Sequence, residues 1–211
     1  FAFCCFAAAA HADNRQLQGF YYGNSEQPSG IEWQSPDSLA YNKEQPRATF
    51  YSFADVESAR RVLPEQSAYW LSLNGTWKFH WSPNPDERPA DFYKPDFDVA
   101  GWDDLTVPSS WNIAGLQKDG SQRYGTPIYV NQPVIFQHKV AVDDWRGGVM
   151  RTPPTHWTTY KHRNEVGSYR RTFELPKEWD GRQVYISFDG VDSFFYFWIN
   201  VRYVGFSKNS S

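Results

Sequence analysis

Residues 184–206 constrain the fold of this chain more than any other stretch. Two aromatic runs flank a polar turn, Asp189-Gly190-Val191-Asp192-Ser193. The second run, residues 194–199, is apolar at every position, which is typical of a strand buried on both faces of a sheet. We interpret Asp189 and Asp192 as turn residues whose side chains cap backbone amides, not as a catalytic carboxylate pair. This stretch therefore predicts a β-sheet with a deeply buried strand.

The same period of two recurs elsewhere in the chain. Trp77, Phe79 and Trp81 share one face of a predicted strand that follows the turn residues Asn74-Gly75. Two further predicted strand faces are formed by Tyr169, Phe173 and Leu175, and by Val184, Ile186 and Phe188. Short strands separated by Gly, Pro and Asp, without a long helical pattern, predict an all-β fold, an antiparallel β-sandwich.

Composition and charge narrow the class of partner. Aromatic residues make up 18% of the 211 residues, ten of them Trp, which fits a carbohydrate-handling β-protein. The formal net charge is −3, and no run of Lys or Arg interrupts the sequence. Such a chain has no long-range field that would attract phosphate backbones or anionic lipid. We therefore expect neither nucleic acid nor a membrane surface as partner.

Residues 1–12 differ in kind from the rest of the chain. They are apolar and uncharged, and they end in Ala10-His11-Ala12 before the polar Asp13. This pattern predicts the remnant of a secretory signal peptide, and hence a secreted protein, periplasmic or extracellular. The alternative, a buried helix or strand, leaves the abrupt boundary at Asp13 unexplained. Cys4 and Cys5 fall inside this segment, so a cleaved chain would have no disulfide and no thiolate metal site.

Residues 13–55 are rich in Gln, Asn, Ser, Pro and Gly and show no sustained period. We interpret them as an extended N-terminal arm that lies over the folded body, with a disordered linker as the alternative. The sandwich itself is then expected over residues 56–211.

Five motifs, in order, resemble the sugar-binding domain of family 2 glycoside hydrolases, the group that holds the large bacterial β-galactosidases. They lie at residues 73–79, 98–112, 125–131, 167–176 and 184–206. Within the arm, the family's leader is resembled by Trp33, Pro36, Asn42, Pro46, Ala48 and Phe50. The resemblance implies a jelly roll of the galactose-binding-like type, truncated at its C-terminus because the chain stops at Ser211 before the remaining strands.

The resemblance also implies a function, that of the N-terminal part of a secreted β-galactosidase. Such enzymes hydrolyse terminal non-reducing β-D-galactose residues with retention, using two glutamates on a (β/α) barrel. That catalytic barrel of the same polypeptide is missing here, so we assign no catalytic residue and expect the fragment alone to be inactive. The glutamates Glu165, Glu174 and Glu178 flank a predicted strand and are expected to form a solvated surface.

One residue is expected to bind substrate. Asn131 matches the family's asparagine that hydrogen-bonds galactose at the edge of the barrel's active site. An amide both donates and accepts hydrogen bonds, so it can read neighbouring sugar hydroxyls. The alternative is that Asn131 only satisfies a loop backbone between Pro127 and Pro133. The expected partner is a β-galactoside oligosaccharide or polysaccharide, and residues 132–164, longer than the usual connection, would reshape the pocket entrance.

No metal site is expected in this fragment. The histidines His80, His138, His156 and His162 lack the paired spacing of metal ligands, and no cofactor is expected either. For the parent enzyme the resemblance allows Mg²⁺ and Na⁺, bound mainly by the barrel, and also a homo-oligomer.

Two alternative functions and one departure from the family remain open. A stand-alone carbohydrate-binding jelly-roll module would need solvent-facing aromatic platforms, whereas these aromatics occupy positions typical of a core. A family 2 β-glucuronidase or β-mannosidase would share the sandwich. The departure is Asn200-Val201, where the family has Asn-Gly. Val is unsuited to the positive φ of a tight turn, so Val201 predicts either a wider loop or backbone strain.

Overall fold

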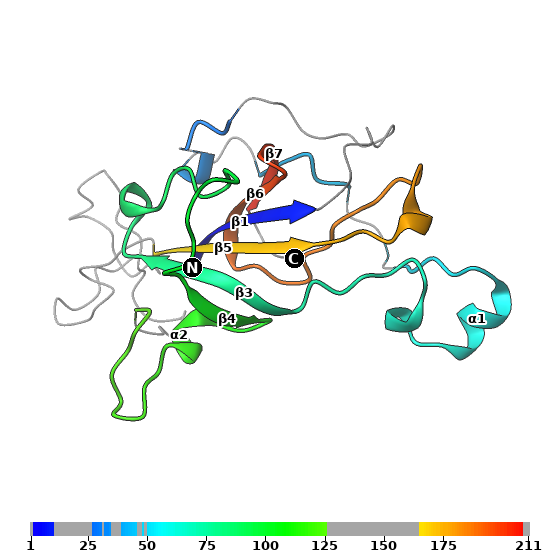
Figure 1. Ribbon diagram of the computed structural model, residues 1–211, viewed down its shortest axis with the longest axis horizontal. Coiled ribbons are helices and arrows are strands. Elements are labelled where there is room, and N and C mark those ends of the chain that lie inside the picture. The colour runs from blue at the N-terminus through cyan, green and yellow to red at the C-terminus, as the bar shows by residue number, and fades with distance from the viewer. Residues whose placement is uncertain are drawn as a thin grey trace, which may run out of the picture.

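The computed structural model describes residues 2–10 by their backbone, and residues 27–30, 32–34, 39–45, 48, 50–125 and 165–208 (Figure 1). Asn131 and the long connection 132–164 lie outside the described residues. So do the histidines other than His80.

Among the described residues, seven strands form one sheet, in the order β2-β7-β6-β1-β5-β3-β4. They are β1 (Ala2–Ala10), β2 (Ala40–Tyr41), β3 (Gly75–Ser82), β4 (Asp103–Val107), β5 (Val166–Phe173), β6 (Ser193–Ile199) and β7 (Arg202–Lys208). The helices are short: α1 (Val56–Arg61), α2 (Trp111–Ala114) and 3-10 turns at Glu32–Gln34, Pro64–Gln66, Pro85–Glu87 and Lys177–Trp179. The all-β prediction is confirmed, and α1 lies well clear of the sheet at the right of Figure 1.

Hydrophobic side chains pack on both faces of the sheet, as the uniform apolar character of residues 194–199 predicts. Alternate β6 residues belong to different core clusters, because successive side chains of a strand point to opposite faces. The first cluster consists of Phe92, Val166, Phe194, Tyr196, Trp198, Tyr203 and Phe206. The second consists of Trp77, Phe79, Leu105, Trp111, Tyr124, Tyr169 and Phe197, with Trp81, Phe195 and Ile199 partly buried against it. The predicted face shared by Trp77, Phe79 and Trp81 is thereby confirmed.

Residues 183–188 do not form the predicted strand. They run without ladder pairing, although Ile186 and Phe188 pack on the second cluster, and the Phe188 ring lies 4.7 Å from that of Phe195. The alternating pattern thus correctly separates the partly buried Val184, Ile186 and Phe188 from the exposed residues between them. A strand also needs a neighbouring backbone, and none among the described residues pairs with this segment.

Strand β1 occupies an interior position, paired in parallel with β5 on one side and β6 on the other. Residues 2–10 therefore adopt the alternative considered above, a strand within the fold. Cleavage after Ala12 would remove this strand. Export itself is not tested by strand pairing, so the signal peptide stays a prediction.

The turn between β6 and β7 contains only Asn200 and Val201, both with positive φ, 47° and 73°. The prediction of a wider loop is thus wrong. The turn is tight, and its backbone is strained. A left-handed conformation costs a residue with a Cβ roughly 1–2 kcal/mol, and the β-branched Val201 is especially unsuited to it.

Part of the arm lies along the edge of the sheet. Strand β2 pairs antiparallel with β7, and the amide of Asn42 donates a 2.9 Å hydrogen bond to the Val204 carbonyl oxygen. The Tyr41 ring stacks on Tyr203 with centroids 5.9 Å apart. These contacts cover the backbone of β7, which would otherwise be an exposed strand edge. The boundaries at residues 12 and 55 stay predictions.

Candidate functional site

The structure brings together the two residues that flank the segment carrying Asn131. Gly125 has φ +71°, and a Cβ placed on it would lie 2.2 Å from Oε1 of Glu165. The carboxyl group of Glu165 therefore packs directly on the Gly125 backbone. Only glycine suits both the positive φ and the close approach at this position.

Glu165 is buried, with 8% of its surface exposed, so the expectation that it lies on a solvated surface is wrong. Glu174 and Glu178 are exposed, as expected. The period-two pattern begins only after Glu165, so nothing local indicated its burial. The glutamate is covered because residues distant in sequence, from β3 and α2, close over the start of β5.

The donors around Glu165 are few and weak. The Asn112 amide lies 3.5 Å from Oε2 and makes its better hydrogen bond, 2.7 Å, to the Tyr124 carbonyl oxygen. No hydrogen bond of good geometry reaches Oε1 from the described residues. Burial raises the pKa of Glu165 to about 7, although the nearby side chains of Trp81, Asn112 and Trp111 act in the opposite direction. The group is thus an acid that is partly protonated near neutral pH.

Trp111 fixes the helix that presents Asn112. The residue is 4% exposed, and its indole packs over Gly167 of β5, where an added Cβ would lie 2.5 Å from the ring. The Phe79 ring lies 5.9 Å away on the second cluster. Close packing of Trp111 on a glycine therefore places α2 against the sheet next to Glu165.

Tyr124, the residue before Gly125, is hydrogen-bonded to a second carboxyl group, that of Asp103. Asp103 of β4 accepts a 2.5 Å hydrogen bond from the Tyr124 hydroxyl and another of 2.5 Å from the Arg123 guanidinium. Burial raises the pKa of Tyr124 to about 12, and the Asp103 hydrogen bond acts in the same direction. The tyrosine therefore remains a neutral donor at physiological pH.

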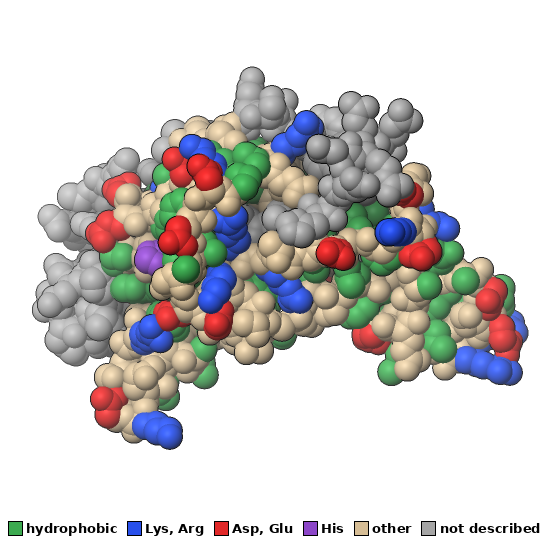
Figure 2. All heavy atoms as spheres, viewed as in Figure 1, with side chains coloured by type: hydrophobic (Ala, Val, Ile, Leu, Met, Phe, Trp, Pro, Cys, Tyr) green, Lys and Arg blue, Asp and Glu red, His purple; other side chains and the backbone are tan. Residues whose placement is uncertain are grey.

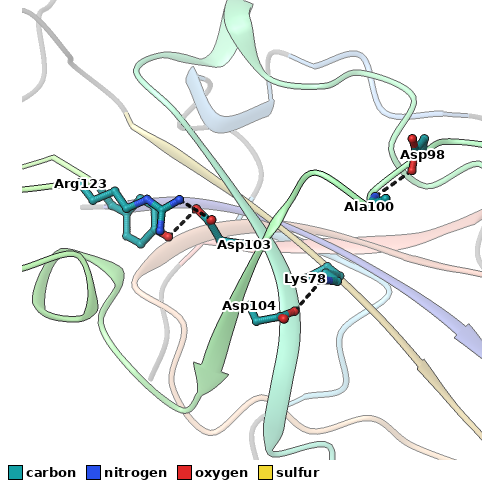
Figure 3. Close-up of polar contacts among 7 residues, drawn as sticks. Lys78, Asp98, Ala100, Asp103, Asp104 and Arg123 are labelled. Carbon is teal, nitrogen blue, oxygen red and sulfur yellow. Dashed lines mark hydrogen bonds and ion pairs between the residues drawn. The ribbon is translucent and has the colours of Figure 1, made fainter.

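Other polar contacts near β4 are on the surface. Lys78 and Asp104 pair across β3 and β4 with a 2.8 Å ion pair, and Asp98 accepts from the Ala100 amide at 2.8 Å (Figure 3). On the face drawn in Figure 2, acidic and basic side chains are interspersed, and neither sign gathers into a large patch.

The chemical capacity of the described residues is limited. They contain no group of three or more His, Cys, Asp or Glu side chains that could hold a metal ion. His80 stacks on Trp102 with centroids 5.4 Å apart, and burial lowers its pKa while Asp103 opposes this effect. Within the same residues, no helix has the length and apolar character needed to cross a membrane.

Comparison with known proteins gives a consistent picture. Residues 70–211 match the family model for glycosyl hydrolases family 2, sugar binding domain. A β-galactosidase of Priestia megaterium is 37% identical over 180 residues, which cover 85% of this chain and 16% of that enzyme. A β-galactosidase of Halalkalibacterium halodurans is 33% identical over 183 residues, 86% of this chain and 16% of the relative.

A further relative is the β-galactosidase large subunit of Lactobacillus helveticus, 32% identical over 192 residues, which are 86% of this chain and 27% of the subunit. The chain thus spans between a sixth and about a quarter of the length of these curated relatives. The family match begins just before β3 and includes β3 to β7, the strands that carry both core clusters. The chain therefore belongs to glycosyl hydrolases family 2, and residues 70–211 are its sugar-binding domain.

Proposed function

We propose that this chain is the sugar-binding part of a β-galactosidase that hydrolyses terminal non-reducing β-D-galactose residues with retention. The observation that carries the proposal is the family match over residues 70–211, together with relatives that are β-galactosidases. Because the chain spans only 16% of the first two relatives, the activity belongs to a longer polypeptide.

The two catalytic carboxyl groups lie, in this proposal, on a barrel outside the 211 residues. Retaining hydrolysis needs two carboxyls about 5 Å apart that face each other across the sugar. Asp103 accepts hydrogen bonds from Arg123 and Tyr124, and Glu165 is buried against Gly125. Neither carboxyl is placed to meet a substrate, which supports an architectural role for the described residues.

Asn131 is the residue that we propose to contact galactose. It follows Gly125 by six positions, and Gly125 is anchored by Glu165 on one side and by the Tyr124–Asp103 hydrogen bond on the other. The assignment of Asn131 itself rests on its match to the family's asparagine at this position.

The stand-alone binding module is the weaker alternative. Its sugar platforms would be solvent-facing aromatic rings, but the aromatics of β6 are largely buried in the two clusters. A β-glucuronidase or β-mannosidase is disfavoured because the relatives are named β-galactosidases.

Three accompanying features are also proposals. Secretion is supported by the apolar, uncharged residues 1–12. Homo-oligomerisation and the metals Mg²⁺ and Na⁺ follow from the family resemblance. The described residues do not fit a metal site, since they lack a cluster of ligand side chains, so we place any such ions on other parts of the parent.

The test compares the 211-residue chain with the longer polypeptide. We expect the longer polypeptide to release phenol from an aryl β-galactoside, much faster than from the β-glucuronide or β-mannoside, and the 211-residue chain to match a buffer blank. Proton NMR of the first-formed sugar should show the β-anomer, as retention requires. A preference for another glycoside, or an initial α-anomer, would refute the corresponding part of the proposal.

A further inference from the structure

Glu165 is a buried acid that has no part in the chemistry proposed above. Its carboxyl group lies against the backbone of Gly125. In the sequence, residues 126–164 connect Gly125 to Glu165, so this contact joins the two residues that flank them. Asn131, which we propose to contact galactose, belongs to the segment between these two residues.

The contact is made by the face of the carboxyl group. A Cβ placed on Gly125 would lie 2.2 Å from Oε1, 2.4 Å from Oε2 and 2.5 Å from the carboxyl carbon of Glu165. Because these three distances are nearly equal, the plane of the carboxyl group covers Gly125, and its edges are not directed at this residue. The contact is therefore steric, and it depends on a flat group of this size.

Gly125 sets the direction in which the chain enters residues 126–164. Its φ is +71°, and glycine adopts positive and negative φ about equally well. A glycine at the start of a long segment therefore allows several chain directions unless its backbone is restrained. A rotation about φ would displace the Gly125 backbone from the carboxyl group that covers it. Glu165 thus restrains a residue that has little conformational preference of its own.

Glu165 can restrain Gly125 because the sheet fixes its own position. It directly precedes β5, whose first residue, Val166, is fully buried and pairs with β3. The Asn112 amide lies 3.5 Å from Oε2 of Glu165 and donates a 2.7 Å hydrogen bond to the Tyr124 carbonyl oxygen. The carboxyl group and the backbone that leads into Gly125 are therefore held by the same short helix, α2.

We propose that Glu165 is a positioning residue for the galactose contact. By covering Gly125 it fixes the chain direction at the start of the segment that carries Asn131, and so sets where the Asn131 amide meets a sugar hydroxyl. A displacement of about 1 Å is enough to impair such a contact. The inference rests on the proposed function, since it requires the longer polypeptide and its contact with galactose through Asn131.

A double-mutant cycle in the longer polypeptide tests the proposal, with kcat/KM on an aryl β-galactoside as the measured quantity. We expect Asn131→Ala to lower kcat/KM about two- to tenfold, the loss of one uncharged hydrogen bond. Glu165→Ala should lower it by no more than this, because it acts through Asn131. The double variant should then match Asn131→Ala, whereas losses from independent residues multiply.

Further variants separate positioning from stability. Glu165→Gln keeps the flat shape, so its kcat/KM should stay within about twofold of the wild type. Glu174→Ala is the matched control, because Glu174 is exposed just beyond β5. If Glu165→Ala does not fold, Glu165→Asp replaces it in the cycle, since the shorter side chain withdraws the carboxyl group from Gly125. Circular dichroism at the assay temperature verifies that each variant is folded.

Several results would overturn the positioning role. They are losses that multiply in the double variant, wild-type kcat/KM in Glu165→Ala or in Asn131→Ala, and equal impairment of Glu165→Gln and Glu165→Ala. A wild-type polypeptide that hydrolyses a different glycoside would refute the proposed substrate, and the same cycle on that glycoside would decide the positioning role. A polypeptide that hydrolyses no glycoside would refute the proposed function and the positioning role together.

Discussion

Two partly or fully buried carboxyl groups, Glu32 in the arm and Glu165 at the start of β5, have opposite pKa shifts. Burial alone would raise the pKa of Glu32, but hydrogen bonds from Tyr196 and from backbone amides outweigh it, so the pKa is lowered. The amides of Ser29 and Gly30 donate at 2.7 and 2.9 Å. Around Glu165 the donors are too poor to offset burial, and its pKa rises to about 7.

The comparison shows that the supply of donors, as much as burial, decides the charge of a carboxyl group. The ionised carboxylate of Glu32 accepts a hydrogen bond from Tyr196 and so holds the arm against β6. Glu165 is held by packing against Gly125, and its charge is unfavourable in the folded chain. The arm contact should therefore weaken in acid, whereas the Glu165 region should strengthen.

The largest expected effect comes from Gly125→Ala, which tests whether packing holds Glu165. The Cβ would meet the carboxyl group at 2.2 Å in a left-handed backbone. We expect the free energy of unfolding to fall by up to about 5 kcal/mol, from about 1–2 for the backbone and about 1–3 for overpacking. Gly120→Ala is the control, because φ is +83° there but nothing lies within 4 Å. Equal losses in urea unfolding of the two variants would contradict the packing role.

Glu165→Gln tests the unfavourable charge. Because the folded pKa of about 7 exceeds the ordinary 4.5, the stability linked to this proton is fully present below pH 4.5 and is lost as the pH rises through 7. Wild-type stability at pH 8 should thus be lower by up to about 3 kcal/mol than at pH 4.5 from this group. Glu165→Gln should remove that pH dependence, and the exposed Glu174→Gln should keep it. An unchanged slope in Glu165→Gln would contradict the assignment.

Tyr196→Phe tests the lowered pKa of Glu32, because it removes the hydroxyl that donates a hydrogen bond to the Glu32 carboxyl group. We expect a loss of about 1–2 kcal/mol at pH 7, at the lower end because Glu32 is largely solvated. Since the Glu32 pKa is lowered in the folded chain, this contribution is present above the ordinary pKa of 4.5 and is lost as the pH falls through the lowered pKa. Tyr203→Phe, which keeps the Tyr196–Glu32 pair, serves as the comparison. A loss that persists undiminished in acid would count against the ion–hydroxyl contact.

The smallest expected effect separates a loss of function from a loss of stability. In the longer polypeptide, Asn131→Ala should lower kcat/KM on β-galactosides by the equivalent of about 0.5–1.5 kcal/mol, or more if the contact tightens in the transition state. Asn131→Asp keeps the size but loses the donor, and should also be impaired. Wild-type kcat/KM in both variants, or a loss explained entirely by a lowered Tm, would refute the sugar contact.

Much of the fold was predictable from local pattern. The period of two in Trp77, Phe79 and Trp81, and the continuous apolar run of β6, correctly predict which faces are buried, because side-chain alternation is a property of a single strand. Backbone strain at Asn200-Val201 is one of the two alternatives that the sequence predicts, because a β-branched residue is unsuited to a tight turn. The ordered motifs were also sufficient to predict the family.

The tertiary structure alone decided which segments became neighbours. Pairing placed the Ala-rich residues 2–10 inside the sheet and left residues 183–188 without a ladder, because a strand depends on a backbone that is distant in sequence. Likewise, the local sequence does not distinguish Glu165 from an ordinary surface glutamate. Its burial depends on Trp81, Asn112 and Gly125, which are distant in sequence. The sequence by itself determined the family and the buried faces, whereas strand neighbours and the charge of a buried acid depended on long-range contacts.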